Sequence, residues 1–366
     1  MKRILILTAA FGEGHNAAAR NLQAAFEHLY PNQAQVIVHD LFASCYGFLN
    51  DITRNAYLSI VNDLPQVWDV LYHWLDRSSS LQNFMASPGI MRRAFKKILD
   101  TIKPDLIISV YPTYPILLRD CWDSKPFPFL NVTIVTDSIT VNSIWHQAPC
   151  DYFFVPNSIT ADLLQRRGIK IESLQALGFP VSLFFSQLQN LEPPSNKKRL
   201  LFMINSRHRQ ALRVVQKLLE HDDLEMTITC GRHLSLFRSL QKLCEDHDNR
   251  CQILGWTPEI PRLLRTHHVV LSKAGGATTQ EAIAAQCPMI VNQVVPGQEE
   301  GNFELLRRYD AGHFATQPEA ISKWVNEIFA NHAQRWQELR QNISRLSRPR
   351  ASLDIAEFLW EKLQSR

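Results

Sequence analysis

The chain has 366 residues, of which 45% are hydrophobic and 20% charged, so it can bury a sizeable core and is not a disordered chain. One hydrophobic core rarely serves this length, and we expect two domains. The 39 basic and 35 acidic residues give a formal net charge of +4, which is too mild to indicate a nucleic-acid partner.

The sequence shows neither a membrane-spanning pattern nor a cysteine cluster. No apolar run approaches the roughly 18 to 20 residues that span a bilayer, and the first apolar run reaches glycine and glutamate too early for a signal peptide. We therefore expect a cytoplasmic protein. The seven cysteines are scattered and form no CxxC pair, which favours free thiols over disulfides or zinc ligands.

Short apolar runs alternate with helical patterns along the whole chain, which is typical of βα units on parallel sheets and predicts an α/β fold. The expected strands of the first half are residues 3–7, 35–40, 105–110, 130–137 and 152–156. Those of the second half are residues 200–205, 226–231, 251–256, 268–276 and 288–293. Each set predicts one doubly wound sheet.

A polar, proline-bearing stretch at residues 186–198 has the composition of an interdomain linker. We place the first domain at 1–185 and the second at 199–349. Residues 350–366 form a C-terminal helix that is a candidate to pack back on the first domain.

Residues 46–100 interrupt the alternation and predict a helical insertion in the first domain. This stretch is rich in large apolar side chains and ends in a basic segment that holds Arg92, Arg93, Lys96 and Lys97. Apolar stripes of this kind are more often a packing face than a ligand site. The alternative is a membrane-contacting surface, because aromatic and basic side chains suit a lipid headgroup region.

The stretch "FGEGHNAAAR" after the first strand places Gly12, Gly14 and His15 where a helix begins near Asn16. Its buried stripe is expected at Ala18, Leu22, Ala25 and Leu29. The helix dipole favours a neutral imidazole at this end, which is the form a general base needs. Capping of the turn is the plainer alternative for His15.

Two α/β domains in tandem predict a cleft at the carboxyl ends of their sheets, and both domains are expected to contribute to it.

The stretch "LSKAGGATTQEAIAAQCPMIVNQVVPGQEEGNFELL" carries the second candidate site. Gly275 and Gly276 open a helix whose N-terminal amides suit a diphosphate. Glu281, one turn further, suits a ribose, and Gln298 and Glu299 suit sugar hydroxyls. A plain strand-turn-helix connection would explain the glycines, but it leaves the later "PGQEEGN" without a reason.

The chain resembles the monogalactosyldiacylglycerol synthase and processive diacylglycerol glucosyltransferase family, which is related to the lipid II-forming transferase. The resemblance rests on "GEGHNAAA", "VTDSITVNSIWHQAPCDYFFVPNSITADLLQRRGI", "LGFPV", "SKAGGATTQEA" and "PGQEEGN". It implies a GT-B glycosyltransferase with two Rossmann-like domains facing a central cleft. It also implies a UDP-sugar held mainly by the second domain, a lipid acceptor approached from the first, inversion at the anomeric carbon, and neither a cofactor nor an obligatory metal.

The resemblance assigns roles residue by residue. His15 is implied to act on the acceptor hydroxyl, and Asp137 of the "TD" motif to orient His15 or the acceptor, with capping of the next turn as the alternative for Asp137. Glu281 is the implied ribose ligand. The implied diphosphate turn is Gly275, Gly276, Ala277 and Thr278, and the implied donor-sugar loop is Pro296, Gly297, Gln298, Glu299 and Asn302. The further implied substrate-binding residues are Gly12, Gly14, Asn142, Trp145, Arg207, Gly231, Arg232 and Lys273.

Three departures from the family pattern suggest a divergent donor or acceptor. The expected glycine-rich turn after the first strand of the second domain is replaced by "INSRHRQ", where Arg207 and its neighbours either bind phosphate or alter the donor pocket. Asn142 stands where the family commonly has a histidine, and Trp145 is kept. Glu13 precedes the GH pair, where it would raise the pKa of His15 or serve as an extra acceptor.

The function implied is the transfer of a hexose from a UDP-sugar to a membrane lipid such as diacylglycerol, with His15 as the candidate base. The alternatives are a sugar-nucleotide epimerase and a UDP-sugar-binding protein that has lost catalysis. We expect peripheral association with the cytoplasmic membrane. The sequence leaves open the sugar, the lipid, processivity and the oligomeric state.

Overall fold

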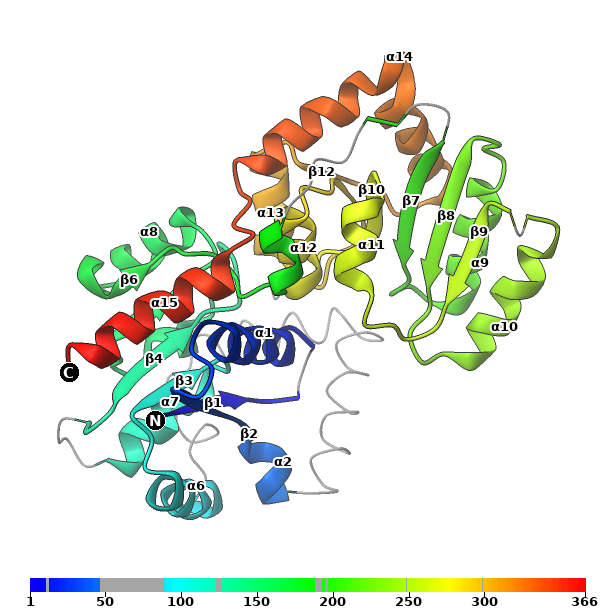
Figure 1. Ribbon diagram of the computed structural model, residues 1–366. Helices are drawn as coiled ribbons and strands as arrows, with labels where there is room; N and C mark the ends of the chain where they lie inside the picture. Colours follow the sequence, from blue (N-terminus) through cyan, green and yellow to red (C-terminus); the bar gives the residue numbers. More distant parts are fainter. Residues whose placement is uncertain are drawn as a thin grey trace. The chain divides into compact units, whose positions relative to one another are not determined.

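The computed structural model describes residues 1–10, 13–46, 89–122, 127–187, 193–194, 197–247, 249–297 and 299–366. These residues fold into two α/β units (Figure 1). Unit 1 comprises Met1–Leu183, Val295–Gly301 and Arg350–Arg366, and unit 2 comprises Phe184–Val294 and Asn302–Pro349. Each unit contains one parallel six-stranded sheet, which confirms the predicted fold class.

The sheet of unit 1 has the strand order β2-β1-β3-β4-β5-β6, and its described pairs are all parallel. Its central strands are apolar and buried, because helices cover both faces of such a sheet. The two-residue strand β6 is too short to leave a pattern in the sequence. The strands are β1 (Lys2–Thr8), β2 (Ala34–Asp40), β3 (Leu106–Ser109), β4 (Leu130–Ile134), β5 (Tyr152–Phe154) and β6 (Leu174–Gln175).

Helices pack around this sheet. The helix α1 begins at Glu13, not near Asn16, so Gly14 and His15 lie in its first turn. Of the expected stripe, Ala18, Leu22 and Ala25 are buried, whereas Leu29 is half-buried. The described helices of unit 1 are α1 (Glu13–Leu29), α2 (Leu41–Tyr46), α6 (Gly89–Ile102), α7 (Thr113–Cys121), α8 (Ser158–Arg166) and α15 (Ala351–Gln364), with short 3₁₀ turns η1 (Ser143–His146) and η2 (Ile171–Ser173). A further 3₁₀ turn, η3 (Leu183–Gln187), begins at the last residue of the unit's first segment.

The C-terminal helix α15 packs on α1 although the two are more than 300 residues apart in the chain (Figure 1). The rings of Tyr30 and Trp360 stack with their centroids 4.1 Å apart. The hydroxyl of Ser352 donates a hydrogen bond to the carbonyl of Val181 at 2.5 Å. These contacts attach the end of the chain to unit 1.

The sheet of unit 2 has the order β12-β11-β10-β7-β8-β9, again with parallel pairs among its described strands. The strands are β7 (Lys198–Met203), β8 (Leu224–Thr229), β9 (Cys251–Leu254), β10 (Val269–Lys273), β11 (Met289–Gln293) and β12 (Gly312–Phe314). The helices are α9 (His208–Leu218), α10 (Leu234–Leu243), α11 (Ile260–Thr266), α12 (Gly276–Ala284), α13 (Glu300–Arg308) and α14 (Pro318–Ser344), with the 3₁₀ turn η4 (Glu245–His247).

The segment Val295–Gly301 groups with unit 1, although the sequence around it belongs to unit 2. The order of elements along the chain gave no sign of this, because a loop can pack on residues far from it in sequence. The grouping matters for function, since this segment holds most of the implied donor-sugar loop.

The expected insertion at 46–100 is described only at its two ends. Residues 47–88 lie outside the described residues, and α6 forms the basic segment that follows them. Within the part of the chain that the structure describes, no helix combines the length and apolarity that a membrane crossing requires. All seven cysteines are free, as predicted.

His267 offers a test of the core of unit 2. The ring is buried between the carbonyl of Leu263, 2.7 Å from Nδ1, and the hydroxyl of Thr227, 2.9 Å from Nε2, and burial lowers its pKa to about 4. The unfolded state therefore binds the proton first, so the free energy of unfolding should fall as the pH drops from 6.5 to about 4. In His267→Gln this fall should shrink by roughly 3 kcal/mol.

Denaturant unfolding of the wild type and His267→Gln at pH 7 and pH 4, followed by circular dichroism, measures the difference. His233→Gln, which removes an exposed histidine from the same unit, is the control. An equal loss of stability in wild type and His267→Gln would contradict the assignment.

Candidate active site

His15 is fixed by a backbone carbonyl. Its Nδ1 lies 2.7 Å from the oxygen of Val110, the residue that follows β3, and 3.3 Å from the hydroxyl of Thr136, which follows β4. A carbonyl oxygen only accepts hydrogen bonds, so Nδ1 of the neutral ring must carry the proton. The lone pair is then on Nε2, where it can accept a proton from another molecule.

The surroundings of His15 keep the ring neutral. Burial lowers its pKa from 6.5 to about 4, and the hydrogen bond to Val110 opposes this only in part. The ring contacts Tyr111 edge-on at a centroid distance of 5.0 Å and Trp145 at 6.1 Å. Desolvation by these neighbours is the main cause of the neutral state, where the sequence had suggested the helix dipole.

The expected effect of Glu13 on His15 is wrong. Glu13 is exposed and forms an ion pair with Arg20 at 3.3 Å, and it is not among the groups that shift the pKa of the half-buried His15. The pKa of His15 is lowered, not raised. Gly14 lies half-buried in the same helical turn, and Gly12 is outside the described residues.

Asp137 is held by Trp145. The indole Nε1 donates a hydrogen bond to Oδ2 at 2.6 Å. Burial raises the pKa of Asp137 to about 6, and the bond from Trp145 works against that rise. Asp137 was expected to orient His15 or the acceptor; in the described part of the chain the carboxylate binds Trp145, while Val110 orients His15.

Trp145 and Asn142 have structural roles in this segment. Trp145 is only 1% exposed and packs in a core cluster with Val135 and Phe153, so its ring is not open to a ligand. Its role is to hold the carboxylate of Asp137 through the indole Nε1. Asn142 begins the turn η1, where its side chain accepts a hydrogen bond from the amide of Ile144 at 3.0 Å. The residue at the family's histidine position therefore caps a turn.

In unit 2, the turn between β10 and α12 has the geometry of an anion site. Lys273 ends β10, Gly275 precedes the helix with no side-chain cap, and the first helical hydrogen bond runs from the amide of Thr279 to the carbonyl of Gly275 at 2.9 Å. The amides of Gly276, Ala277 and Thr278 precede that bond and point out of the helix end. Glu281 lies half-buried one turn later.

The missing glycine turn after β7 is replaced by Asn205. Its Nδ2 donates to the carbonyl of Met203 at 2.8 Å and to the hydroxyl of Ser272 at 3.0 Å, which ties the end of β7 to the end of β10. Arg207 precedes α9, and the side chains of Arg207, His208 and Arg209 are exposed. They lie on the same carboxyl edge as Gly275, because β7 and β10 are neighbours in the sheet.

The same edge carries an aromatic residue that the sequence reading missed. Gly231, at φ +57°, and Arg232 follow β8, and Trp256 follows β9. The guanidinium of Arg232 lies 5.8 Å from the centre of the Trp256 ring, which is 63% exposed. Its signal was a large aromatic residue shortly after a predicted strand, at the edge where α/β sheets bind ligands.

The implied donor-sugar loop is largely turned inward. Glu299 is 5% exposed, and its Oε2 accepts a hydrogen bond from the amide of Val295 at 3.0 Å. Pro296 precedes Gly297, whose φ of +73° favours glycine. Asn302, in unit 2, donates to the carbonyl of Ala274 at 3.1 Å and so packs behind the anion turn. Gln298 is outside the described residues.

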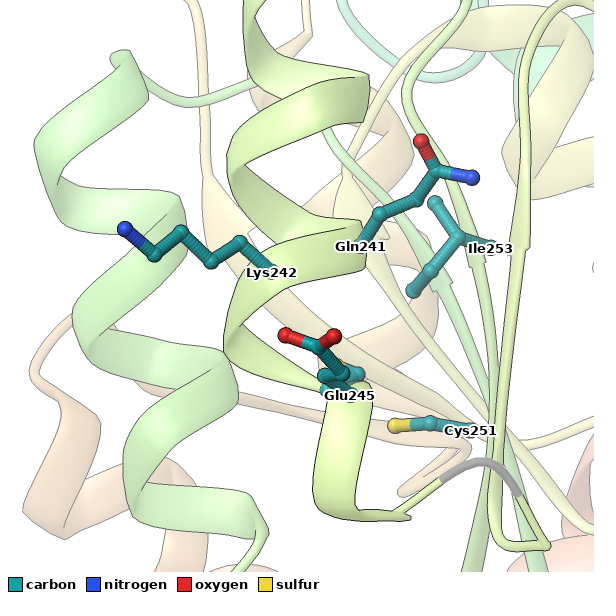
Figure 2. A pocket seen from close by; sticks show the side chains of 6 residues that line it. Gln241, Lys242, Glu245, Cys251 and Ile253 are labelled. Carbon is teal, nitrogen blue, oxygen red and sulfur yellow. The ribbon is translucent and has the colours of Figure 1, made fainter.

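A cavity of about 410 Å³ in unit 2 lies away from these residues (Figure 2). It is lined by Gln241, Lys242, Cys244, Glu245, Cys251 and Ile253. Cys251 is the first residue of β9, so the cavity borders the amino-terminal end of that strand. Ligands of open α/β sheets bind at the carboxyl ends, and we assign this cavity no part in the site. Among the described residues, no group of three or more His, Cys, Asp or Glu side chains could hold a metal.

Comparison with known proteins adds the family to this geometry. Residues 15–181 match the family model of monogalactosyldiacylglycerol (MGDG) synthase. A processive diacylglycerol beta-glucosyltransferase of Bacillus cereus (strain B4264) is 27% identical over 320 residues, which are 84% of this chain and 81% of that protein. Both findings support the resemblance of this chain to the diacylglycerol glycosyltransferases. A second relative of the same description, from Bacillus pumilus (strain SAFR-032), is 24% identical over 99% of this chain and 95% of its own.

Solved structures agree on the fold of this chain. The Staphylococcus aureus MnaA–UDP structure has a TM-score of 0.63 at 15% identity and covers 100% of this chain and 97% of its own. Medicago truncatula UGT71G1 complexed with UDP-glucose has a TM-score of 0.62 at 11% identity and covers 99% and 98%. At these identities the likeness concerns the fold, which is GT-B.

Proposed function

We propose that the protein transfers a hexose from a UDP-sugar to a membrane lipid of the diacylglycerol kind, with inversion at the anomeric carbon and with His15 as the general base. The observation that carries the mechanism is the bond from Nδ1 of His15 to Val110, because it leaves a lone pair on Nε2. The names of the relatives, which are diacylglycerol glucosyltransferases, support the proposed class of acceptor.

A weak base is sufficient for this reaction. As the acceptor oxygen attacks the anomeric carbon, the bond from that carbon to the UDP oxygen breaks, and the attacking hydroxyl becomes strongly acidic. A base with a pKa of about 4 can take this proton, and because it is neutral across physiological pH it needs no prior deprotonation. One proton passes to Nε2, and UDP leaves with the electron pair of the broken bond.

The leaving diphosphate would be held by unit 2. The amides of Gly276, Ala277 and Thr278 and the helix dipole of α12 favour negative charge at this turn, and Lys273 ends the strand beside it. We therefore expect transfer without a cofactor or an obligatory metal. Glu281 remains our proposed ribose ligand, and Trp256 with Arg232 offers a flat surface for the base of the nucleotide.

The acceptor brings the protein to a membrane surface. A diacyl lipid cannot leave the bilayer cheaply, because each exposed CH₂ costs about 0.8 kcal/mol. In α6 the apolar face, with Met91, Phe95 and Leu99, is buried in the core of unit 1. The opposite face exposes its basic side chains, so we propose that this face contacts anionic lipid: Arg92, Arg93, Lys96 and Lys97.

The fold is compatible with two other functions. Epimerases share the fold, but at 12% to 13% identity that likeness extends no further. An epimerase would release a new UDP-sugar with no acceptor present, which product analysis detects. A protein without catalysis was suggested by the missing glycine turn; Asn205 supplies the local hydrogen bonds there, which weakens that argument.

Replacement of His15 by alanine tests the base. We expect turnover to fall by roughly the 10² to 10⁴ typical of a general base. Affinity for UDP should stay within about twofold, because the proposed diphosphate site lies in unit 2 and contains no part of α1. Calorimetry with UDP and a transfer assay with UDP-hexose and diacylglycerol vesicles measure both. His28→Ala, an exposed histidine on the same helix, is the matched control. Turnover at the wild-type level in His15→Ala would refute the role.

Neutralising α6 tests the membrane surface. Replacing all four basic residues by glutamine should weaken sedimentation with anionic vesicles, because each basic residue near an anionic surface contributes about 1 kcal/mol. Binding of the wild type should rise with the anionic lipid fraction and fall with salt.

The control removes the same charge from exposed positions of unit 2: Arg213, Arg238, Lys242 and Lys323. It should bind vesicles as the wild type does. If the α6 variant sediments as well as this control, the four residues make no membrane contact.

A further inference from the structure

An unusual turn follows Asp137. The amide of Thr140 donates a hydrogen bond to the carbonyl of Ser138 at 2.6 Å, two residues back, which closes a very tight turn. The residue at its centre, Ile139, has φ +59°. A β-branched side chain rarely adopts this backbone conformation, which costs on the order of 1 to 3 kcal/mol.

Neighbouring side chains hold this strained turn in place. The amide of Ile139 donates to the hydroxyl of Thr160 at 3.0 Å, and that hydroxyl donates to Asn157 at 3.0 Å. Asn157 also donates from its Nδ2 to the hydroxyl of Ser138 at 3.4 Å. Such a conformation persists only where its surroundings over-determine it, and it is often found at functional sites.

The strained turn presents Thr140 to the segment Val295–Gly301. The hydroxyl of Thr140 accepts a hydrogen bond from the amide of Gly301 at 3.0 Å. It donates a longer and weaker one to the carbonyl of Gly297 at 3.4 Å. One side chain therefore contacts the segment at two points, four residues apart.

The contact is too close for any residue but glycine at position 301. A Cβ added there would lie 1.8 Å from the carbonyl oxygen of Ser138 and 2.6 Å from the amide nitrogen of Thr140. Both are backbone atoms, so neither can move aside as a flexible side chain would. Gly301 and Thr140 thus fit each other in this conformation.

We propose that Thr140 is a positioning residue, which seats the Val295–Gly301 segment and thereby sets its contacts with the donor sugar. The inference rests on the proposed function, in which a UDP-sugar is the donor, and on the resemblance, which implies that this segment binds the donor sugar. Its neighbours in the chain explain why seating matters: Glu299 binds its own backbone at Val295, and Asn302 packs against Ala274 behind the anion turn. A shift of Gly301 would move both.

Replacing Thr140 by valine keeps the shape of the side chain and removes its hydroxyl. We expect the amide of Gly301 to exchange hydrogen faster, since its acceptor is lost. The KM for UDP-hexose should rise by about tenfold, as for a lost hydrogen bond in a binding loop. The Kd for UDP alone should change by less than about twofold, because UDP lacks the sugar.

Two further variants separate positioning from general damage. Thr140→Ser keeps the hydroxyl and should restore both the exchange rate and the KM. Gly301→Ala should reproduce the effects of Thr140→Val. The matched control is Gly89→Ala, where the added Cβ would meet nothing nearer than Arg92 at 3.9 Å; it should behave as the wild type.

The outcomes distinguish this inference from the proposed function. A wild-type KM and exchange rate in Thr140→Val, or a Thr140→Ser variant as impaired as the valine, overturns the role of Thr140 while transfer itself continues. A wild-type protein that transfers no hexose from any UDP-sugar overturns the proposed function instead.

Discussion

The hydrogen bond between His15 and the carbonyl of Val110 is the constraint on which the proposed chemistry depends. Backbone geometry provides it. The strands β1 and β3 are neighbours, and the amide of Val110 donates to the carbonyl of Leu7 at 2.9 Å, so the end of β3 is fixed against the end of β1, the strand that precedes α1. A backbone carbonyl cannot donate, and the tautomer of His15 is therefore set by the sheet, not by another titrating side chain.

Around this bond, the segment after β4 supplies the remaining contacts. Thr136 approaches Nδ1, Trp145 packs near the ring and binds Asp137, and the tight turn at Ile139 leads to Thr140. The five residues 136–140 thus contact the candidate base at one end and the Val295–Gly301 segment at the other. Between them lies the half-buried carboxyl of Asp137, whose pKa is raised to about 6, and such perturbed groups often mark functional sites.

The sequence predicted the parts that repeat a local pattern. Alternating apolar runs predicted all the strands of both sheets except the short β6 and β12, and "GEGH" and "SKAGGATTQEA" placed His15 and Gly275 at helix starts that the structure contains. It could not predict the role of Val110, because the hydrogen bond that fixes the tautomer of His15 is made by a backbone carbonyl, which every residue type carries. Trp256 could not be predicted as a site residue either, because a large aromatic residue next to a strand usually packs in the core. The exposure of its ring is visible only in the structure. The grouping of Val295–Gly301 with unit 1 depends on a contact across more than 150 residues.

The most direct test of the account is the protonation state of His15, measured by ¹⁵N NMR of the histidine rings, with His15→Gln to assign the signal. We predict a neutral ring with the proton on Nδ1 and a protonation midpoint near pH 4, because burial lowers the pKa to about 4. A neutral ring protonated on Nε2 would show that the lone pair is not available there and would contradict the proposed role of His15. A midpoint near the ordinary 6.5 would show that burial does not keep the ring neutral and would contradict the account of its environment.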